Sequence, residues 1–206
     1  MPIPLYHITE IGNLASIIEC GGLWCDAERR RQKFAHVNIA HDHIKGRRER
    51  RRVPVVPGTT LADYVPFYFA SRSPMLFAIN RNNVEGYAGG QRRIVHLVTT
   101  VEAVVALGQG YCFTDRHAEL IYAKFFTDLA DIDENVDWNV MSRKYWSDST
   151  DMRERRQAEF LARNCVPWSA VSEVGVMDAE TQAAVSATLR QAGANTPVTV
   201  QRSWYY

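Results

Sequence analysis

A single carboxylate interrupts an apolar run late in the chain. Glu159 stands between Ala158 and Phe160 in the segment Gln157–Ala162. Burying a carboxylate is costly unless the group is paired or put to use. Glu159 is therefore a candidate catalytic or ligand-binding residue. A position at the rim of an amphipathic strand is the alternative.

Arginines form the second group that could do chemistry. Arg47, Arg48 and Arg50–Arg52 lie in a stretch, residues 28–52, that carries ten Lys/Arg against three Asp/Glu. Several cations on one side of a segment can contact phosphates, and such contacts need no particular order of residues. The alternative is a solvated charged face, which is the usual role of a charge run.

His7 and the aromatic run Phe67–Phe69 are further candidates. His7 follows Tyr6 in a short segment of aromatic and β-branched residues, where a histidine is either structural or a ligand. Alternate residues of a strand face opposite sides, so one ring of Phe67–Phe69 could stack on a flat ligand while the others fill the core. A purely structural role for all three rings is the alternative.

The composition excludes several classes of protein. The 206 residues carry a net charge of only +1, whereas a protein that simply coats nucleic acid is usually more basic, so any contact with a polyanion needs a local patch. No GxGxxG, Walker, GxSxG or HExxH motif is present.

The four cysteines form no CxxC pair and match no zinc template, so we expect reduced thiols and no metal. Without a signal peptide or a run of roughly 20 apolar residues, we expect a cytoplasmic protein with no membrane partner.

Short strands and irregularly interspersed helices must position these residues. The pattern predicts an α+β fold in a single domain, residues 1–206, with the polar stretch 115–156 as an active-site loop region. Asn13 can cap a helix that Gly21-Gly22 ends. Part of 39–52 is expected to be helical and most of 26–52 to be loop. The predicted strands are 5–9, 64–69, 93–99, 111–114, 172–176 and 197–200, and the other predicted helices are 74–79, 101–107, 119–126, 152–157 and 179–192.

Short motifs spread along the chain make up a further pattern. These stretches are Tyr6–Thr9, Ile44–Arg48, Asp63–Phe69, Arg72–Met75, Gly89–Gln91, Phe113–His117, Gln157–Leu161 and Trp204–Tyr206. The most specific are the block from Asp63 to Met75 and the TDRH and AEFL elements. Together they resemble the DarT family of DNA ADP-ribosyltransferase toxins, since they occur in the family's order and span nearly the whole chain.

The resemblance implies an ADP-ribosyltransferase fold of two packed, mainly antiparallel sheets, with helices around a cleft for NAD⁺. It implies modification of thymine in single-stranded DNA and a DarG-like macrodomain antitoxin as partner. Glu159 and Arg48 match the catalytic residues, with Arg47 as the alternative one position away. The NAD⁺-binding set by position is His7, Thr9, Asn13, Tyr68 and Arg48, and the DNA-contacting set is His117, Met75, Arg153 and Arg47, with Arg156 beside it.

These residue types suit that chemistry. A fixed carboxylate at Glu159 can stabilise the positive charge that develops on ribose as nicotinamide leaves. Arg48 is a poor base, so we expect it to stabilise the developing anion on the thymine ring instead. The thymine N3 is paired in a duplex, which favours a single-stranded substrate. A protein or RNA acceptor, or a non-enzymatic nucleic-acid-binding module around residues 29–52, are the alternatives.

Overall fold

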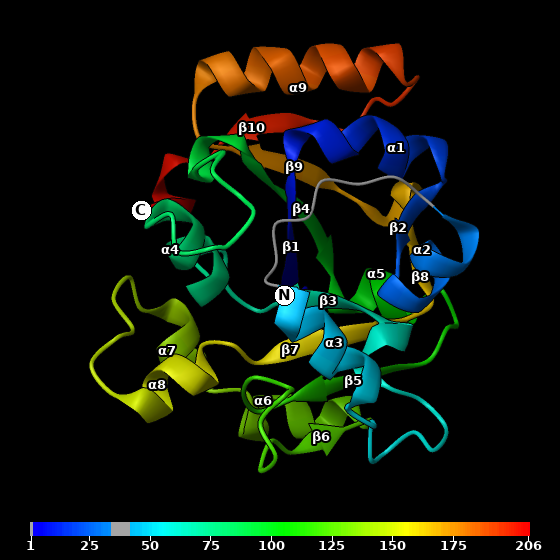
Figure 1. Ribbon diagram of the computed structural model, residues 1–206, viewed down its shortest axis with the longest axis vertical. Helices are drawn as coiled ribbons and strands as arrows, with labels where there is room; N and C mark the ends of the chain where they lie inside the picture. Colours follow the sequence, from blue (N-terminus) through cyan, green and yellow to red (C-terminus); the bar gives the residue numbers. More distant parts are fainter. Residues whose placement is uncertain (1, 34–41) are drawn as a thin grey trace.

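Hydrogen-bonded strands form the centre of the computed structural model, which describes residues 2–33 and 42–206 (Figure 1). Within these residues, eight strands make one sheet in the order β10-β9-β4-β1-β3-β7-β5-β6, and β2 and β8 pair separately. The strands are β1 (Pro4–Glu10), β2 (Gly22–Trp24), β3 (Tyr64–Tyr68), β4 (Ile94–Thr100), β5 (Tyr111–Thr114), β6 (Phe125–Phe126), β7 (Glu159–Arg163), β8 (Cys165–Pro167), β9 (Glu173–Val176) and β10 (Val198–Val200).

The large sheet has a weak joint between β1 and β3. These two strands share one register pair, Tyr6 with Tyr68, whereas β1 pairs with β4 along its whole length, from Pro4 to Glu10. The sheet therefore consists of two four-stranded halves, β10-β9-β4-β1 and β3-β7-β5-β6. Only β9 and β10 run parallel among the described pairs, so the mainly antiparallel α+β architecture is confirmed.

Helices surround both halves of the sheet. Figure 1 shows α9 along one end of the molecule beside β10, and α7 and α8 at the other end beside the second half of the sheet. No helix of the described residues is long and apolar enough to cross a membrane. The helices are α1 (Leu14–Glu19), α2 (Asp26–Gln32), α3 (Asp42–Arg50), α4 (Pro74–Asn80), α5 (Val101–Val105), α6 (Ile132–Asn135), α7 (Trp138–Ser142), α8 (Thr150–Arg155) and α9 (Ala179–Gln191).

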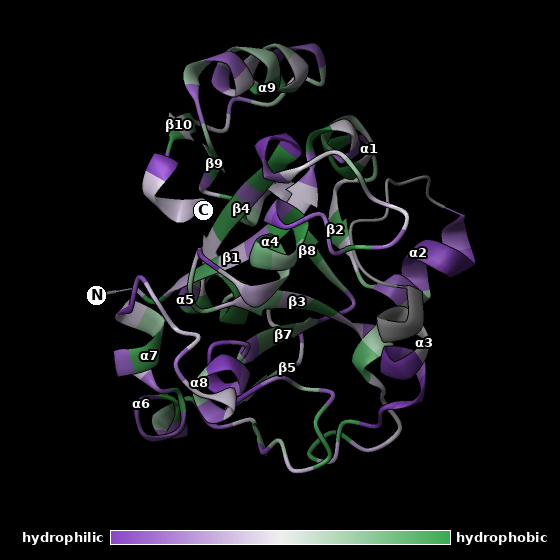
Figure 2. Cartoon of the chain, turned by 60° about the vertical axis from the view of Figure 1, so that its left-hand side comes forward, coloured by the Kyte–Doolittle hydropathy of each residue, from purple (hydrophilic) through white to green (hydrophobic). Residues whose placement is uncertain are grey.

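The main core lies between the sheet and the helices that cover it. Val185 and Leu189, four residues apart on one face of α9, are buried in the same cluster as Val174 of β9 and Leu14 of α1. Figure 2 shows the same division, with apolar residues concentrated in the strands and polar residues on α2 and α8. Burial of one helical stripe against the sheet is what fixes α9 in place.

The polar parts of the chain depart most from the predictions. The expectation that residues 26–52 are mostly loop is wrong, because α2 and α3 cover most of its described part. The helix expected at 119–126 is also absent; turns lead there into β6, where Phe125 pairs with Thr114 of β5. The 39–41 part of the expected helix lies outside the described residues.

Local signals predicted most other elements correctly. Ser73 caps α4 by accepting a hydrogen bond from the backbone N–H of Leu76 at 3.1 Å, with Pro74 in the first turn. Asn13 does precede α1, but its side chain makes no capping bond and instead donates to Thr9. The short strands β2 and β8 were not predicted. The single domain over residues 1–206 stays a prediction.

Asp178 provides a test of how α9 is anchored. Its carboxylate caps α9 by accepting from the backbone N–H of Thr181 at 2.9 Å, and it pairs with Arg92 at 2.7 Å. The Thr181 N–H and the guanidinium lower the pKa of Asp178 to about 2. A depressed folded-state pKa stabilises the protein above the unfolded-state pKa, and this contribution is lost as the pH falls toward 2.

We expect Asp178→Ala to lower the free energy of unfolding by a constant amount above about pH 5. The difference from wild type should shrink as the pH falls from there toward 2, measured by urea unfolding at each pH. Asp133→Ala, at an exposed carboxylate on α6, is the matched control and should follow wild type throughout. A gap between Asp178→Ala and wild type that widens on acidification would contradict this role.

Candidate active site

A buried ion pair joins α3 to the first residue of β7. The Nη1 of Arg48 donates to Oε2 of Glu159 at 2.9 Å. Arg48 is 8% exposed and Glu159 is 3% exposed, so both charges are largely removed from water. Two residues far apart in the sequence are thus held together where the strands β3 and β7 end. The alternative position of Glu159 at an exposed rim is excluded by its burial.

Backbone groups fix the carboxylate further. Oε1 of Glu159 accepts from the backbone N–H of Ala118 at 3.2 Å, and the Glu159 N–H donates to Oγ1 of Thr114 at 3.0 Å. Each carboxylate oxygen therefore has one partner among the described residues. Since a carboxylate oxygen can accept two hydrogen bonds, both retain capacity for a ligand hydroxyl.

Arg48 keeps an unused donor. Its Nη2 is buried and has no hydrogen-bond partner among the described residues. Burial lowers the pKa of the Arg48 guanidinium, but the charge of Glu159, the hydrogen bond to it and the more distant charge of Asp26 together raise the pKa further, and the net shift is upward. Arg48 is therefore a permanent cation whose Nη2 group is available to a ligand, and the cost of leaving Nη2 unpaired is removed when a ligand accepts from it.

Tyr68 lies directly across the strand pair from Glu159. The register of β3 and β7 places the two residues opposite each other. Burial and then the negative charge of Glu159 raise the pKa of the Tyr68 hydroxyl above its usual value. Tyr68 is therefore neutral at pH 7 and can donate a hydrogen bond but is a poor base.

His7 bridges the open joint between β1 and β3. Its Nδ1 lies 2.9 Å from the carbonyl oxygen of Pro66, and because a carbonyl only accepts, Nδ1 carries the proton. Burial lowers the pKa of His7, and the nearby positive charge of Arg29 on α2 lowers it further. His7 is thus neutral at pH 7, and its Nε2 is left as an acceptor.

Thr9 and Asn13 support the end of β1 next to His7. Both are buried, and Nδ2 of Asn13 donates to Oγ1 of Thr9 at 3.1 Å. With His7 they line one side of the β1 terminus, while Arg48, Tyr68 and Glu159 belong to the β3–β7 side. The predicted NAD⁺-binding residues thus come from both sides of the sheet joint.

Only part of the predicted DNA-contacting set lies near this centre. His117 adjoins Ala118, whose N–H binds Glu159, and Met75 lies in the first turn of α4. Arg47 is half exposed and pairs with Glu119 at 2.9 Å, so it faces away from the buried pair. Arg153 is exposed on α8 and lines a separate pocket rather than the site around Glu159.

Arg156 does not fit the expected DNA contact. It is 3% exposed, and its guanidinium donates to four backbone carbonyls. These belong to Arg72, Val140, Met141 and Arg143. Arg156 therefore ties α7 and α8 to the start of α4, and its donors are used within the protein.

Sequence reasoning missed the partners that hold Glu159. Thr114 contributes a hydroxyl and Ala118 only a backbone N–H, and neither residue type signals a site by itself. The described residues contain no group of three or more His, Cys, Asp or Glu arranged to hold a metal ion.

Comparison with known proteins identifies the family. The family model described as "ssDNA thymidine ADP-ribosyltransferase, DarT" matches residues 6–206. The chain belongs to the DarT family. A DNA ADP-ribosyl transferase of Thermus sp. (strain 2.9) is 41% identical over all of this chain and 97% of its own length. A Mycobacterium tuberculosis protein of the same description is 29% identical over 98% of this chain and 88% of its own.

Solved structures of a DarT protein confirm the fold. The structure of Thermus sp. 2.9 DarT in complex with ADP-ribosylated ssDNA superimposes with a TM-score of 0.92 at 41% identity, covering 100% of this chain and 97% of that one. The same protein in complex with NAD⁺ gives a TM-score of 0.90 at 39% identity, covering 100% of this chain and 98% of that one. The ADP-ribosyltransferase fold expected from the resemblance is therefore present.

Burial of the Arg48–Glu159 pair predicts how far the free energy of unfolding falls when one partner is removed. Arg48→Ala leaves the Glu159 carboxylate without its cation, and we expect the free energy of unfolding to fall by about 3 kcal/mol. Adding Glu159→Gln removes the unpaired charge and should restore part of that loss. Arg143→Ala is the matched control, because both side chains of the Arg143–Asp148 pair are more than half exposed and such a pair should contribute less than about 1 kcal/mol. Chemical denaturation measures all four proteins, and equal losses at Arg143 and Arg48 would rule out the special status of the buried pair.

Proposed function

We propose that this chain transfers the ADP-ribosyl group of NAD⁺ to a thymine base of single-stranded DNA, with Glu159 and Arg48 as catalytic residues. The observation that carries the proposal is the buried Arg48–Glu159 pair at the sheet joint, with one guanidinium N–H left free. Membership of the DarT family supports the reaction, and the NAD⁺ and ADP-ribosylated ssDNA complexes of the Thermus protein support the two substrates.

Glu159 acts on the ribose. NAD⁺ supplies the ADP-ribosyl group, and positive charge develops on the ribose as the bond to nicotinamide breaks. The carboxylate is held by Arg48 and by the Ala118 N–H, so it need not reorganise when that charge appears. The remaining acceptor capacity of its oxygens suits a hydrogen bond from the ribose 2′-hydroxyl.

Arg48 acts on the base. Its upward-shifted pKa excludes it as the group that removes a proton. The free Nη2–H instead suits an oxygen of the thymine ring, where negative charge develops as N3 attacks and loses its proton. Because N3 is paired in duplex DNA, an unpaired strand is the accessible acceptor. His117 and Met75 border this side of the site and are proposed to contact the base, with Arg47 and Arg153 contacting the strand.

The β1 side of the joint is proposed to hold NAD⁺. The neutral His7 offers Nε2 as an acceptor for a ribose hydroxyl, since Nδ1 is committed to Pro66. Thr9 and Asn13 fix the strand end beside it, and the protonated Tyr68 hydroxyl can donate to the nicotinamide ribose or amide.

A macrodomain antitoxin is proposed as the functional partner, with this chain as the toxin. A Thermosipho africanus relative, 26% identical over 98% of this chain and 49% of its own length, is described as a DNA ADP-ribosyl transferase–DNA ADP-ribosyl glycohydrolase fusion protein. A glycohydrolase linked to the transferase suits a partner that removes the modification. The cytoplasm is the proposed location, since DNA and NAD⁺ meet there.

Glu159→Gln tests the central role of the carboxylate. The amide keeps the shape and an acceptor for Ala118 but lacks the charge, so we expect kcat to fall at least about 10²–10³-fold. Mass spectrometry of a thymine-bearing oligonucleotide after incubation with NAD⁺ measures the transfer, with RNA and protein as alternative acceptors. Glu180→Gln, at an exposed carboxylate on α9, is the control and should match wild type. Full transfer by Glu159→Gln would remove the proposal.

The state of His7 predicts a pH dependence for NAD⁺ binding. Because burial lowers the pKa of His7, acidification through 6.5 leaves it neutral at first. Only at lower pH does Nε2 gain a proton, so that it no longer accepts from the ribose hydroxyl and places a buried positive charge near Arg29. We expect the KM for NAD⁺ to be flat from about pH 8 to 6.5 and to rise below. His7→Ala should raise that KM by about tenfold with no further rise from this group. A wild-type KM that falls on acidification would contradict this assignment.

A further inference from the structure

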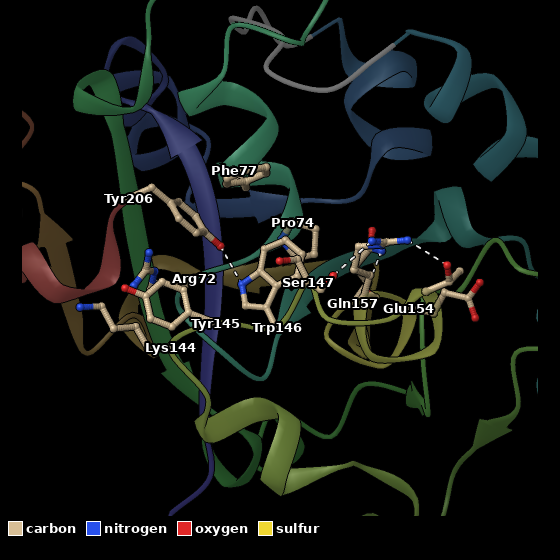
Figure 3. Close-up of a pocket in the computed structure, with 12 residues that line it drawn as sticks. Arg72, Pro74, Phe77, Lys144, Tyr145, Trp146, Ser147, Glu154, Gln157 and Tyr206 are labelled. Carbon is tan, nitrogen blue, oxygen red and sulfur yellow. Dashed lines mark hydrogen bonds between the residues drawn. The ribbon is translucent and has the colours of Figure 1, made fainter.

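A pocket of about 520 Å³ lies beside the proposed active site, between α4, the segment joining α7 to α8, and Tyr206 (Figure 3). Its size is within the range of about 300–1,000 Å³ that is usual for small-ligand sites. None of the residues proposed for NAD⁺ binding lines it. The pocket is therefore a second candidate binding site on the same face of the chain.

Aromatic side chains form its walls. Trp146 donates from Nε1 to the Tyr206 hydroxyl at 2.9 Å, and the Phe77 ring meets Trp146 edge to face at 5.9 Å between centroids. The Tyr206 hydroxyl in turn donates to the Ser73 carbonyl at 3.2 Å. Tyr145 differs from these rings because it is 70% exposed. The structure thus offers fixed aromatic walls and one mostly exposed ring, over which Nζ of Lys144 lies at 5.6 Å from the centroid, to stack on a ligand.

The charges around these rings are positive. Arg72, Lys144 and Arg153 line the pocket, and none forms an ion pair within the described part of the chain. Arg153 donates only to uncharged oxygens, those of Ser147 and Thr150. The buried Nε of Arg72 has no partner among the described residues, while its guanidinium lies 4.2 Å above the Tyr206 ring.

One carboxylate also lines the pocket, but it is already engaged. Glu154 accepts from Arg116 at 3.3 Å and from the Tyr122 hydroxyl at 2.7 Å. The pocket therefore combines ring faces with unpaired cations. That combination suits a nucleobase and the phosphates beside it, and it is how proteins bind single strands.

Backbone hydrogen bonds link a residue that lines the pocket to the catalytic centre. The backbone carbonyl of Glu154 accepts from the N–H of His117 at 3.1 Å, and His117 adjoins Ala118, which binds Glu159. On the other side, Pro74 lines the pocket and is followed by Met75. A strand whose base lies at His117 and Met75 can thus continue along α8 into the pocket.

We propose that this pocket binds a nucleobase of the substrate strand outside the modified thymine, with Tyr145 stacking on it and Lys144 and Arg153 contacting its phosphates. This rests on the proposed function, and it adds a subsite that fixes which bases flank the thymine. Stacking on an aromatic side chain typically changes affinity by roughly 5- to 100-fold per base. Since Tyr145 is one of several rings, we expect a change of about 5- to 10-fold.

The test is an abasic scan with two readouts. A single-stranded oligonucleotide with one thymine is compared with versions that lack one base at each other position. Fluorescence anisotropy gives the Kd, and mass spectrometry gives kcat/KM for transfer. With wild type, we expect one flanking position where base removal weakens binding about 5- to 10-fold. Tyr145→Ala should bind the intact strand that much more weakly and lose the effect of that position only.

Matched variants separate stacking from other causes. Tyr145→Phe keeps the ring and should keep the positional effect. Lys144→Ala should lower the salt dependence of the Kd, by about 0.7 in log–log slope. Arg190→Ala, at an exposed cation on α9 at the far end of the molecule in Figure 1, should leave both readouts unchanged.

Two results would overturn the subsite. One is an abasic profile that is the same for Tyr145→Ala and wild type, and the other is a Tyr145→Ala effect confined to the KM for NAD⁺, which would assign the pocket to that substrate. Failure of the proposed function looks different: the wild type would bind the strand, with the same positional effect, but transfer no ADP-ribose.

Discussion

The contact between Arg48 and Glu159 is the constraint on which the rest of the site depends. A carboxylate that is 3% exposed is tolerated only beside a cation, and the cation comes from a helix 111 residues earlier in the chain. The pair positions α3 against the start of β7. Burial and then the charge of Glu159 raise the pKa of Tyr68, and the same carboxylate keeps the pKa of the buried Arg48 above its usual value. A charged centre of this kind contributes little net stability, so its geometry is better explained by the reaction than by folding.

The open joint in the sheet makes room for that centre. Where β1 and β3 separate after the Tyr6–Tyr68 pair, backbone groups lose their usual ladder partners. The Pro66 carbonyl is one of these groups, and the ring of His7 takes the place of a strand N–H by donating to it. The same hydrogen bond fixes the tautomer of His7. A gap in the hydrogen-bonding ladder therefore both separates the two halves and orients His7, whose role in NAD⁺ binding is a proposal, between them.

The sequence predicted those strands and helices that depend mainly on neighbouring residues. The strands that are apolar along their length and the helices with Ser73 or Asp178 at their start follow from pattern and capping, and Glu159 stood out because its neighbours are apolar. Residues 26–52 were misread because their charge suggested a solvated loop, although Arg, Glu and Gln are good helix formers and Asp26 begins α2 with a favourable charge. Thr114 and Ala118 hold Glu159 because of strand register and backbone position. Neither role can be predicted from the type of residue.

Arg48 and Arg156 show why burial alone cannot separate function from structure. Both are arginines less than 10% exposed, and both lie near charged neighbours in the sequence. Arg156 donates to four backbone carbonyls, so its donors serve the fold. Burial lowers the pKa of Arg156 to about 10, and no carboxylate partner offsets this. Arg48 has a carboxylate partner and an N–H with no acceptor among the described residues. The unsatisfied donor, rather than the buried charge, is what distinguishes a site awaiting a ligand from a structural contact.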